Sequence, residues 1–204
     1  MKSAIVTGAG RGIGAAIAAR LEQADFKVHR YNLADGNDVK NVASIAQFLR
    51  PIESLDLLVN NAAVCVVKPF EEFTFEDWRH TFETNLTGVF NFCKLALPQL
   101  KKARGTIINI GSRAGVYAHP DLAAYCASKA GLMQFTEALA LDLKQYGIRV
   151  GCVMPGIVNT RLSPIESPSW AIQPEDVAEA VLSMVSMPAR TSFGRVELRP
   201  TAWS

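Results

Sequence analysis

The sequence predicts an α/β fold in which one parallel sheet of about six strands carries helices on both faces. Short apolar runs alternate with longer segments of helical apolar spacing, as in doubly wound proteins. The short runs are almost continuously apolar, which is typical of strands buried on both sides. Strands are expected over residues 3–7, 26–33, 56–60, 105–111, 148–154 and 194–199, and helices over residues 12–23, 38–49, 75–101, 121–145 and 174–187.

The first strand runs directly into a glycine-rich turn, Thr7-Gly8-Ala9-Gly10-Arg11-Gly12-Ile13-Gly14, and then into a helix. Glycines let the backbone turn tightly and approach a pyrophosphate, whose charge the helix N-terminus stabilises. The spacing is Gly-x-x-x-Gly-x-Gly and differs from the commoner Gly-x-Gly-x-x-Gly. Strand, turn and helix together predict a dinucleotide-phosphate site, with an ordinary strand–helix turn as the alternative.

The third, fourth and fifth strands end in small or polar residues. These endings are Asn60-Asn61-Ala62-Ala63, Gly111-Ser112 and Pro155-Gly156. In an open parallel sheet, ligands bind beyond the carboxyl ends of the strands. We therefore expect one crevice to be lined by all three endings, although each alone is an ordinary strand-to-loop transition.

Tyr125 and Lys129 lie four residues apart in the helix expected over 121–145, so their side chains share one face. A free tyrosine has a pKa of about 10 and is a poor acid–base catalyst at neutral pH. A neighbouring ammonium favours the phenolate, so Lys129 is expected to lower the pKa of Tyr125. The pair predicts a proton-transfer catalyst. Taken without the other motifs, it also fits an exposed helix face.

Together these residues resemble the short-chain dehydrogenase/reductase family. The motifs occur in the order in which the family has them, and they cover nearly the whole chain. The matching positions are Thr7-Gly8-x-x-x-Gly12-x-Gly14, Asn60-Asn61-Ala62, Asn85, Ser112, Tyr125-x-x-x-Lys129 and Pro155-Gly156-x-x-x-Thr160. The resemblance implies one Rossmann-type domain over residues 1–204 that carries both the cofactor and the substrate site. It also implies an oxidoreductase that interconverts a carbonyl and a secondary alcohol with a nicotinamide cofactor.

The resemblance implies a role for each matching residue. Tyr125 would exchange a proton with the substrate oxygen, and Lys129 would lower the tyrosine pKa and hold ribose hydroxyls. Ser112 would stabilise the substrate carbonyl, and Asn85 would position a water that links Lys129 to solvent. The expected cofactor-binding residues are Thr7, Gly8, Arg11, Gly12, Ile13, Gly14, Arg30, Asn32, Leu33, Asn61, Ala62, Ala63, Tyr125, Lys129, Pro155, Gly156, Val158 and Thr160.

The chain departs from the family pattern on the side that holds adenine. Ala63 stands where the family has glycine, and the segment between Gly14 and Asn60 lacks room for one strand and one helix. The strand that remains is basic, with no carboxylate before Asp35. Arg30 in that strand and Arg11 in the glycine turn favour NADP, because an acidic residue there would repel a 2′-phosphate. NAD stays possible.

Composition excludes several classes of protein. The chain is 49% hydrophobic and 20% charged, with a net charge of +2 and scattered basic residues, which gives nucleic-acid binding no support. No apolar stretch approaches the roughly 20 residues that span a bilayer. The chain begins directly with its first strand, so no secretory signal is expected. The four cysteines, at positions 65, 93, 126 and 152, and the three histidines show no metal-ligand spacing.

The cysteines are expected to be small core residues of a protein in a reducing compartment, the cytoplasm. The loop Arg161–Trp170 is short, and with Ile165, Tyr117 and His119 it predicts a pocket for a small apolar ketone or alcohol. A homodimer or homotetramer is expected, since the helices over 81–101 and 121–145 are apolar on more than one face. A catalytically weak NAD(P)-binding sensor or scaffold protein with the same fold is the alternative function.

Overall fold

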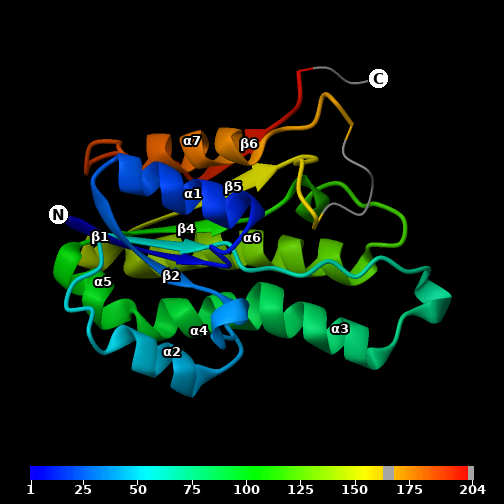
Figure 1. Ribbon diagram of the computed structural model, residues 1–204, viewed down its shortest axis with the longest axis horizontal. Coiled ribbons are helices and arrows are strands. Elements are labelled where there is room, and N and C mark those ends of the chain that lie inside the picture. The colour runs from blue at the N-terminus through cyan, green and yellow to red at the C-terminus, as the bar shows by residue number, and fades with distance from the viewer. Residues whose placement is uncertain (163–167, 202–204) are drawn as a thin grey trace.

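The computed structural model describes residues 1–162 and 168–201 of the 204-residue chain. Its six strands form one sheet in the order β2-β1-β3-β4-β5-β6, and all five strand pairs are parallel (Figure 1). The expected doubly wound, six-stranded sheet is therefore confirmed. The strands are β1 (Lys2–Thr7), β2 (Phe26–Tyr31), β3 (Leu57–Asn60), β4 (Thr106–Ile110), β5 (Arg149–Pro155) and β6 (Arg195–Leu198).

Helices cover both faces of the sheet. The helices are α1 (Gly12–Gln23), α2 (Val42–Leu49), α3 (Phe75–Phe82), α4 (Gly88–Leu95), α5 (Leu97–Ala103), α6 (Ala123–Leu143) and α7 (Pro174–Val185). α1 and α7 pack side by side on one face, and α2, α4 and α6 lie on the other (Figure 1). Ala4 and Val6 of β1 face the first layer, whereas Ile5 faces the second, and all three are fully buried. Burial on both sides explains the continuously apolar strands.

The order of the strands reverses between β1 and β3. The chain leaves β1 for β2 on one side and then returns to β3 on the other side of β1. The connections that leave the carboxyl ends of β1 and β3 therefore diverge, and in open parallel sheets this is the position at which ligands bind. Both the glycine-rich turn and Asn61 follow directly after these two strands, so the fold brings them together.

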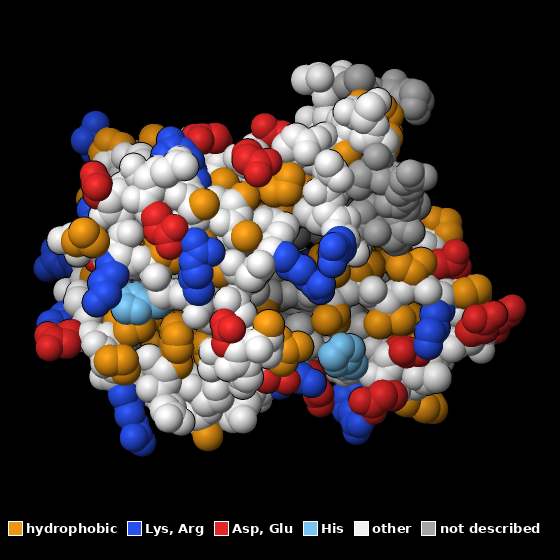
Figure 2. Space-filling view, in the orientation of Figure 1, with side chains coloured by type: hydrophobic (Ala, Val, Ile, Leu, Met, Phe, Trp, Pro, Cys, Tyr) orange, Lys and Arg blue, Asp and Glu red, His pale blue; other side chains and the backbone are white. Residues whose placement is uncertain are grey.

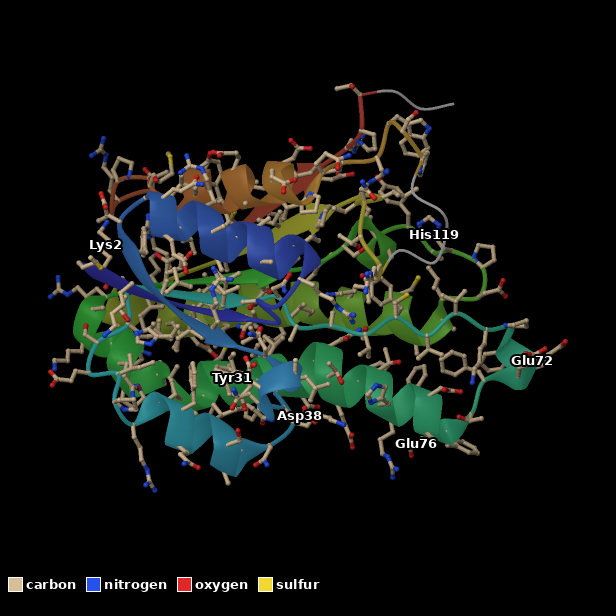
Figure 3. The ribbon with its side chains drawn as sticks, in the orientation of Figure 1. Lys2, Tyr31, Asp38, Glu72, Glu76 and His119 are labelled. Carbon is tan, nitrogen blue, oxygen red and sulfur yellow. The ribbon has the colours of Figure 1, made fainter. Side chains whose placement is uncertain are left out.

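The segment after β2 is short but well anchored. The Tyr31 hydroxyl lies 3.0 Å from the Asp38 carbonyl oxygen (Figure 3), and the Tyr31 ring contacts Phe48 and Phe92 edge to face. β2 ends at Tyr31, and a short helical turn (η1, Leu33–Asp35) begins at Leu33, the last residue of the strand expected over 26–33. The following helix begins at Val42 instead of residue 38, because the Asn41 side chain accepts a hydrogen bond from the Ser44 N–H (3.1 Å) and caps it.

The helix expected over 75–101 is divided into three. A π-helical turn (η3, Glu83–Thr87) separates α3 from α4, and α4 ends before Pro98, which has no N–H to continue the helix. α5 ends at Ala103, and the residue that follows it, Arg104, has a left-handed φ of 50°. Gly105 is required at the next position, since an added Cβ would lie 2.4 Å from the Leu55 carbonyl oxygen.

Candidate active site

Three glycines of the turn between β1 and α1, at positions 8, 12 and 14, are tightly constrained. Gly8 and Gly12 have left-handed φ angles of 65° and 53°. A Cβ on Gly14 would lie 2.3 Å from the Gly8 carbonyl oxygen and 2.5 Å from Asn61 Nδ2. A Cβ on Gly12 would lie 3.3 Å from the Thr160 methyl group, so the residues after β5 reach the same turn. The absence of side chains at these positions therefore lets the turn pack closely against Asn61 and Thr160.

Thr7 and Asn61 hold the glycine turn against the loop after β3. The Thr7 hydroxyl oxygen accepts hydrogen bonds from the backbone N–H groups of Asn61 (2.9 Å) and Ala62 (3.0 Å). In return, Asn61 Nδ2 donates to the carbonyl oxygens of Thr7 (2.9 Å) and Gly8 (3.3 Å). Two segments predicted from separate motifs thus form one rigid wall, with half-buried Ala62 and Ala63 beside it.

A charged and polar group of side chains flanks the turn on the β2 side. The Arg30 guanidinium binds both carboxylate oxygens of Glu22 (2.9 Å each) and the Ala9 carbonyl oxygen (3.3 Å). Asn32 lies against Gly10, donates to Asp35 (3.0 Å), and has a buried Oδ1 atom without a hydrogen-bond partner. The Arg11 guanidinium is exposed and has no partner within the described residues. The charge of Arg30 is thus offset by the Glu22 carboxylate, whereas the charge of Arg11 has no counter-ion among the described residues.

The other expected cofactor residues lie in different settings. Val158 is 6% exposed and packs in the apolar core, and Ile13 is half-buried against the same core. Gly156 follows Pro155 at the end of β5, and its N–H donates to the Leu198 carbonyl oxygen (3.0 Å). The Leu33 side chain is 72% exposed. The binding roles of these residues stay predictions.

Ser112, Tyr125 and Lys129 meet beyond the carboxyl end of β4. Ser112 follows this strand and accepts a hydrogen bond from the Ala114 N–H (3.1 Å), which begins the short turn η4 (Arg113–Gly115). Tyr125 and Lys129 come from the first two turns of α6, and the Lys129 ammonium lies 5.7 Å from the centre of the Tyr125 ring. Lys129 is 3% exposed and donates to the Ile110 carbonyl oxygen (2.8 Å).

The expected lowering of the Tyr125 pKa by Lys129 is wrong for this structure. Burial raises the pKa of Tyr125 above its ordinary value, Cys65 adds to the increase, and a hydrogen bond with Ser112 only partly opposes it. Burial also lowers the pKa of Lys129, to about 8, and its ammonium is directed at a carbonyl instead of the phenol. Tyr125 therefore holds its proton firmly at neutral pH.

Asn85 lies in the π-helical turn and connects two parts of the site. Its side chain accepts a hydrogen bond from the Val64 N–H (2.8 Å) and donates to the Val64 carbonyl oxygen (2.9 Å) and to Ser128 Oγ (3.1 Å). Ser128 in turn donates to the Tyr125 carbonyl oxygen (2.8 Å). The side chain of Asn85 thus fixes the loop after β3 against α6, and its role in holding a water near Lys129 stays a prediction.

A model of the family described as short chain dehydrogenase matches residues 29–168. The chain belongs to this family. An L-fucose dehydrogenase from Oryctolagus cuniculus is 35% identical over 184 aligned residues, which cover 79% of this chain and 64% of that protein. A 3-oxoacyl-acyl-carrier-protein reductase from Staphylococcus aureus is also 35% identical and covers 77% of this chain and 74% of its own. This chain thus spans less than two thirds of the fucose dehydrogenase.

Solved structures of related proteins have the same fold. The closed form of serine dehydrogenase complexed with NADP+ superposes with a TM-score of 0.88 at 28% identity, over 99% of this chain and 96% of the other. The short-chain dehydrogenase family consists of nicotinamide-dependent oxidoreductases, and the residues that match its pattern here are those that the fold gathers at one edge of the sheet.

In this short-chain dehydrogenase, the connection from β4 to α6 carries the residues that the sequence placed on the substrate side of the site. Tyr117 is 46% exposed, and the Arg113 guanidinium lies 4.8 Å from the centre of its ring. Arg113 also forms an ion pair with Glu197 (2.7 Å). His119 is exposed on the same connection (Figure 3). Trp170 is half-buried, and Ile165 lies outside the described residues.

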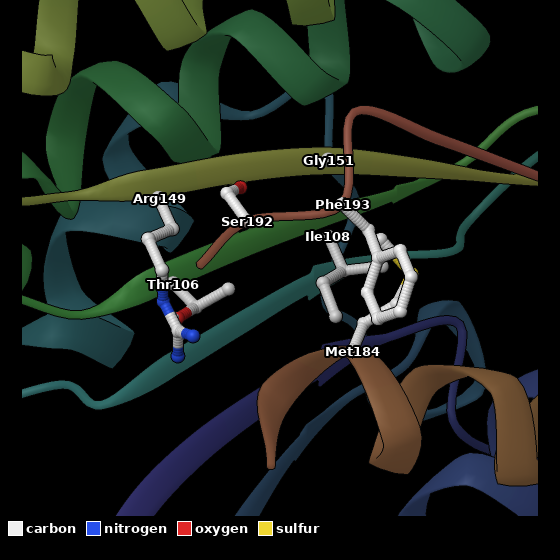
Figure 4. A pocket seen from close by; sticks show the side chains of 7 residues that line it. All are labelled: Thr106, Ile108, Arg149, Gly151, Met184, Ser192 and Phe193. Carbon is white, nitrogen blue, oxygen red and sulfur yellow. The ribbon is translucent and has the colours of Figure 1, made fainter. Parts of the chain in front are cut away.

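Two hollows of the structure lie at the opposite edge of the sheet, near the amino ends of the strands. One is lined by Thr106, Ile108, Arg149, Gly151, Met184, Ser192 and Phe193 (Figure 4). Arg149 donates to Thr106 Oγ1 (2.9 Å) and to the Val185 and Met187 carbonyl oxygens beyond the end of α7, which is a structural role. The second hollow, of about 200 Å³, also lies beside Arg149, and neither is lined by Tyr125.

The surface and the helices add two observations. On the face shown in Figure 2, basic side chains are interspersed with acidic ones. Within residues 1–162 and 168–201, no helix has the length and apolar character needed to cross a membrane, and no group of three or more His, Cys, Asp or Glu residues could hold a metal ion.

The buried Lys129 predicts a pH dependence of stability. Its pKa falls from the ordinary 10.5 to about 8 in the folded chain, so between these values the unfolded chain binds a proton that the folded chain releases. Stability therefore rises with pH across this range, by about 3 kcal/mol relative to a Lys129→Met variant that has no such group. Urea unfolding of both proteins between pH 7.5 and 10.5 (roughly the range that these pKa values span) measures it, and parallel curves would contradict it.

Proposed function

We propose that this chain is an NAD(P)(H)-dependent oxidoreductase that interconverts a carbonyl and a secondary alcohol. The observation that carries the proposal is the meeting of Ser112, Tyr125 and Lys129 at the same edge of the sheet as the glycine turn. The relatives named dehydrogenase and reductase support it. One sheet would then carry both the cofactor and the substrate site, in keeping with a single domain over residues 1–204.

The glycine turn fits a dinucleotide. The tight turn that Gly8, Gly12 and Gly14 allow would present its backbone and the N-terminus of α1 to a pyrophosphate, and α1 has no acidic residue in its first turn to repel it. The buried Oδ1 atom of Asn32 has no partner and suits a ribose hydroxyl as donor. When bound, the nicotinamide ring supplies or accepts the hydride.

The three catalytic side chains have complementary tasks. The Ser112 hydroxyl donates a hydrogen bond to the substrate oxygen and stabilises the negative charge that develops on it during reduction. Tyr125 gives its proton to that oxygen, and its raised pKa keeps the proton available at neutral pH. Lys129, with a pKa of about 8, can return a proton to the phenolate that results. Asn85 positions these groups by holding Ser128 and Val64.

We infer that NADP(H) is the preferred cofactor. The exposed cation of Arg11 supports a 2′-phosphate, and the serine dehydrogenase of the same fold is complexed with NADP+. The contribution of Arg30 is smaller than expected from the sequence, because Glu22 already neutralises it. A fluorescence titration of the purified chain with NADPH and NADH tests the cofactor site, and a screen of small carbonyl compounds then tests turnover. Binding of neither cofactor would overturn the proposed function.

Replacing Arg11 by Ala is expected to weaken NADPH binding by about 10- to 100-fold, the value of a charge-assisted hydrogen bond of roughly 1.5–3 kcal/mol. NADH lacks the 2′-phosphate, so its dissociation constant should change little. The matched control is Arg20→Ala. Arg20 lies in the last turn of α1, away from the glycine turn, and its guanidinium pairs with Glu179. Equal weakening of both cofactors by Arg11→Ala would exclude a contact with the phosphate.

A small apolar ketone or alcohol is the proposed substrate, because the exposed Tyr117 offers aromatic surface on the connection that begins at Ser112. A homodimer or homotetramer is proposed from the surface of α4 and α6. There Phe90 is 50% exposed beside Phe135, and Leu141 is 77% exposed, whereas Phe92 and Leu132 belong to the core. We place the protein in the cytoplasm as part of the same proposal.

A further inference from the structure

The short turn that begins at Ser112 packs against the helix that carries Tyr125 and Lys129. Within the turn η4, the Gly115 N–H donates to the Ser112 carbonyl oxygen (3.1 Å). A Cβ on Gly115 would lie 2.8 Å from the Lys129 carbonyl carbon, so the turn lies directly against the backbone of α6. The place of this turn therefore bears on both sides of the catalytic group.

Arg113 extends from the same turn across the end of β5 to β6. A Cβ on Gly156, the residue directly after β5, would lie 3.5 Å from Arg113 Cδ, so the aliphatic part of Arg113 passes close to this glycine. The Arg113 Nε–H donates to Glu197 Oε1 (2.7 Å), in β6. Because the strands follow one another in the order β4-β5-β6, one side chain joins the turn after β4 to the edge strand (Figure 1).

The ion pair of Arg113 with Glu197 is better shielded from solvent than the other ion pair of the same carboxylate. The two side chains are 17% and 25% exposed, whereas Arg199, which also binds Glu197 Oε1 (2.8 Å), is 55% exposed. Hydrogen bonds from Arg199 and from Arg113 hold the pKa of Glu197 below its ordinary value, so the carboxylate is charged at neutral pH. Partly buried charge-assisted hydrogen bonds are strong and are screened less by salt than exposed ones.

The direction of the Ser112 hydroxyl depends on the backbone that Arg113 belongs to. Ser112 Oγ accepts a hydrogen bond from the Ala114 N–H (3.1 Å), which leaves its own hydrogen to donate. Arg113 stands between these two residues. Its carbonyl oxygen accepts from the N–H groups of Val116 and Tyr117 (2.9 Å each), so Arg113 is at the centre of the turn's hydrogen bonds.

We propose that Arg113 is a positioning residue: bound to Glu197, it holds the turn η4 so that Ser112 presents its hydroxyl to the substrate oxygen. Arg113 acts through Ser112 and touches neither substrate nor cofactor in this role. The effect on turnover rests on the function proposed above, whereas the anchoring of the turn does not. A misplacement of a reacting group by about 1 Å can lower a rate by about 100-fold, so loss of the anchor should lower the rate by roughly 10- to 100-fold.

A double-mutant cycle tests whether Arg113 acts through Ser112. Arg113→Met removes the guanidinium and keeps an unbranched side chain beside Gly156. Single-turnover oxidation of NADPH, with cyclohexanone as a probe for small apolar ketones, is measured for the original chain, Arg113→Met, Ser112→Ala and the double variant. Arg113→Met should lower the rate of the original chain by roughly 10- to 100-fold. In the Ser112→Ala background, it should change the rate by less than about twofold.

Arg199→Met is the matched control. It removes the other guanidinium from the same carboxylate, but Arg199 lies beyond the end of β6 and is not part of η4. Its rate should therefore stay close to that of the original chain. Glu197→Gln is the second variant, because it leaves Arg113 in place and removes the charge that holds it, and it should lower the rate in the same direction as Arg113→Met.

Hydrogen–deuterium exchange of the chain without ligand measures the anchor independently of turnover. The N–H groups of Gly115, Val116 and Tyr117 are hydrogen-bonded within the turn. Their exchange should become several-fold faster in Arg113→Met and in Glu197→Gln, because the turn opens more often, and should stay unchanged in Arg199→Met. A peptide that covers the glycine turn is the internal reference and should exchange equally in all variants.

Two results would overturn the inference. One is exchange in η4 that the loss of Arg113 leaves unchanged. The other is an equal loss of rate with and without the Ser112 hydroxyl, because Arg113 would then act independently of Ser112. A failure of the proposed function would look different, since the original chain itself would lack turnover. The exchange in η4 would still decide whether the ion pair holds the turn.

Discussion

Replacing Tyr125 by Phe is expected to reduce turnover by about 10²- to 10⁴-fold, the usual contribution of a general acid. The substitution removes the hydroxyl that gives its proton to the substrate oxygen and keeps the ring that packs beside Lys129. Binding of NADPH should stay within a few-fold of the original, since the glycine turn and the Thr7–Asn61 contacts are not touched. Steady-state kinetics and the fluorescence titration measure the two effects separately.

Tyr146→Phe is the matched control for this experiment. Tyr146 lies beyond the other end of α6, where Lys101 stacks on its ring, so loss of its hydroxyl should leave turnover unchanged. If Tyr125→Phe retains turnover, the phenol is not the proton donor. If the original chain has no turnover but binds cofactor, the alternative of a sensor or scaffold protein is favoured instead.

Replacing Gly14 by Ala is expected to abolish cofactor binding and to destabilise the fold. The new methyl group would overlap the Gly8 carbonyl oxygen at 2.3 Å and Asn61 Nδ2 at 2.5 Å, both of which belong to the wall of the glycine turn. Overpacking of this kind typically costs about 1–3 kcal/mol. For a chain of this size, that corresponds to a melting temperature lower by roughly 2–12 °C. Thermal unfolding and the NADPH titration measure the two effects.

Gly10→Ala provides the matched control in the same turn. Gly10 does not have a left-handed φ, and an added Cβ would lie 3.5 Å from Asn32, an ordinary contact. Its melting temperature should therefore change little. Equal stability of the Gly14→Ala and Gly10→Ala variants would mean that the turn relaxes freely around the new methyl group. Close packing at Gly14 would then not be what holds the glycine turn against Asn61.

Most of the fold could be predicted from local patterns. Apolar runs that are too short for helices and too continuous for half-exposed strands identified all six strands, and α1 was predicted with its observed bounds. The break at the π-helical turn was missed because Asn85 in this turn contacts Val64 and Ser128, which are distant in sequence, whereas the break before Pro98 had a local signal in the proline itself. The local helix preference of these residues does not depend on such distant contacts.

The candidate site shows the same division. The glycines, Ser112, Tyr125 and Lys129 were found from their types and spacing, because strand endings in a parallel sheet share one edge. The neutralisation of Arg30 by Glu22 was not predicted. The sequence did contain a signal for this ion pair, because it has an acidic residue near the end of α1 and a basic one in β2. The influence of Cys65 on the pKa of Tyr125 was also missed, although Cys65 comes only two residues after Ala63.

The sequence by itself determined the family, the parallel sheet and the residues that gather at its carboxyl edge, since these follow from periodicity and from the chemistry of single motifs. Only the tertiary structure decided the charge states of the site. The pKa of Tyr125 rises, that of Lys129 falls to about 8, and the Arg30 guanidinium forms an ion pair with Glu22. The physical reason is that burial and ion pairing depend on which distant segments pack around a group, and the four-residue spacing of Tyr125 and Lys129 says nothing about that packing.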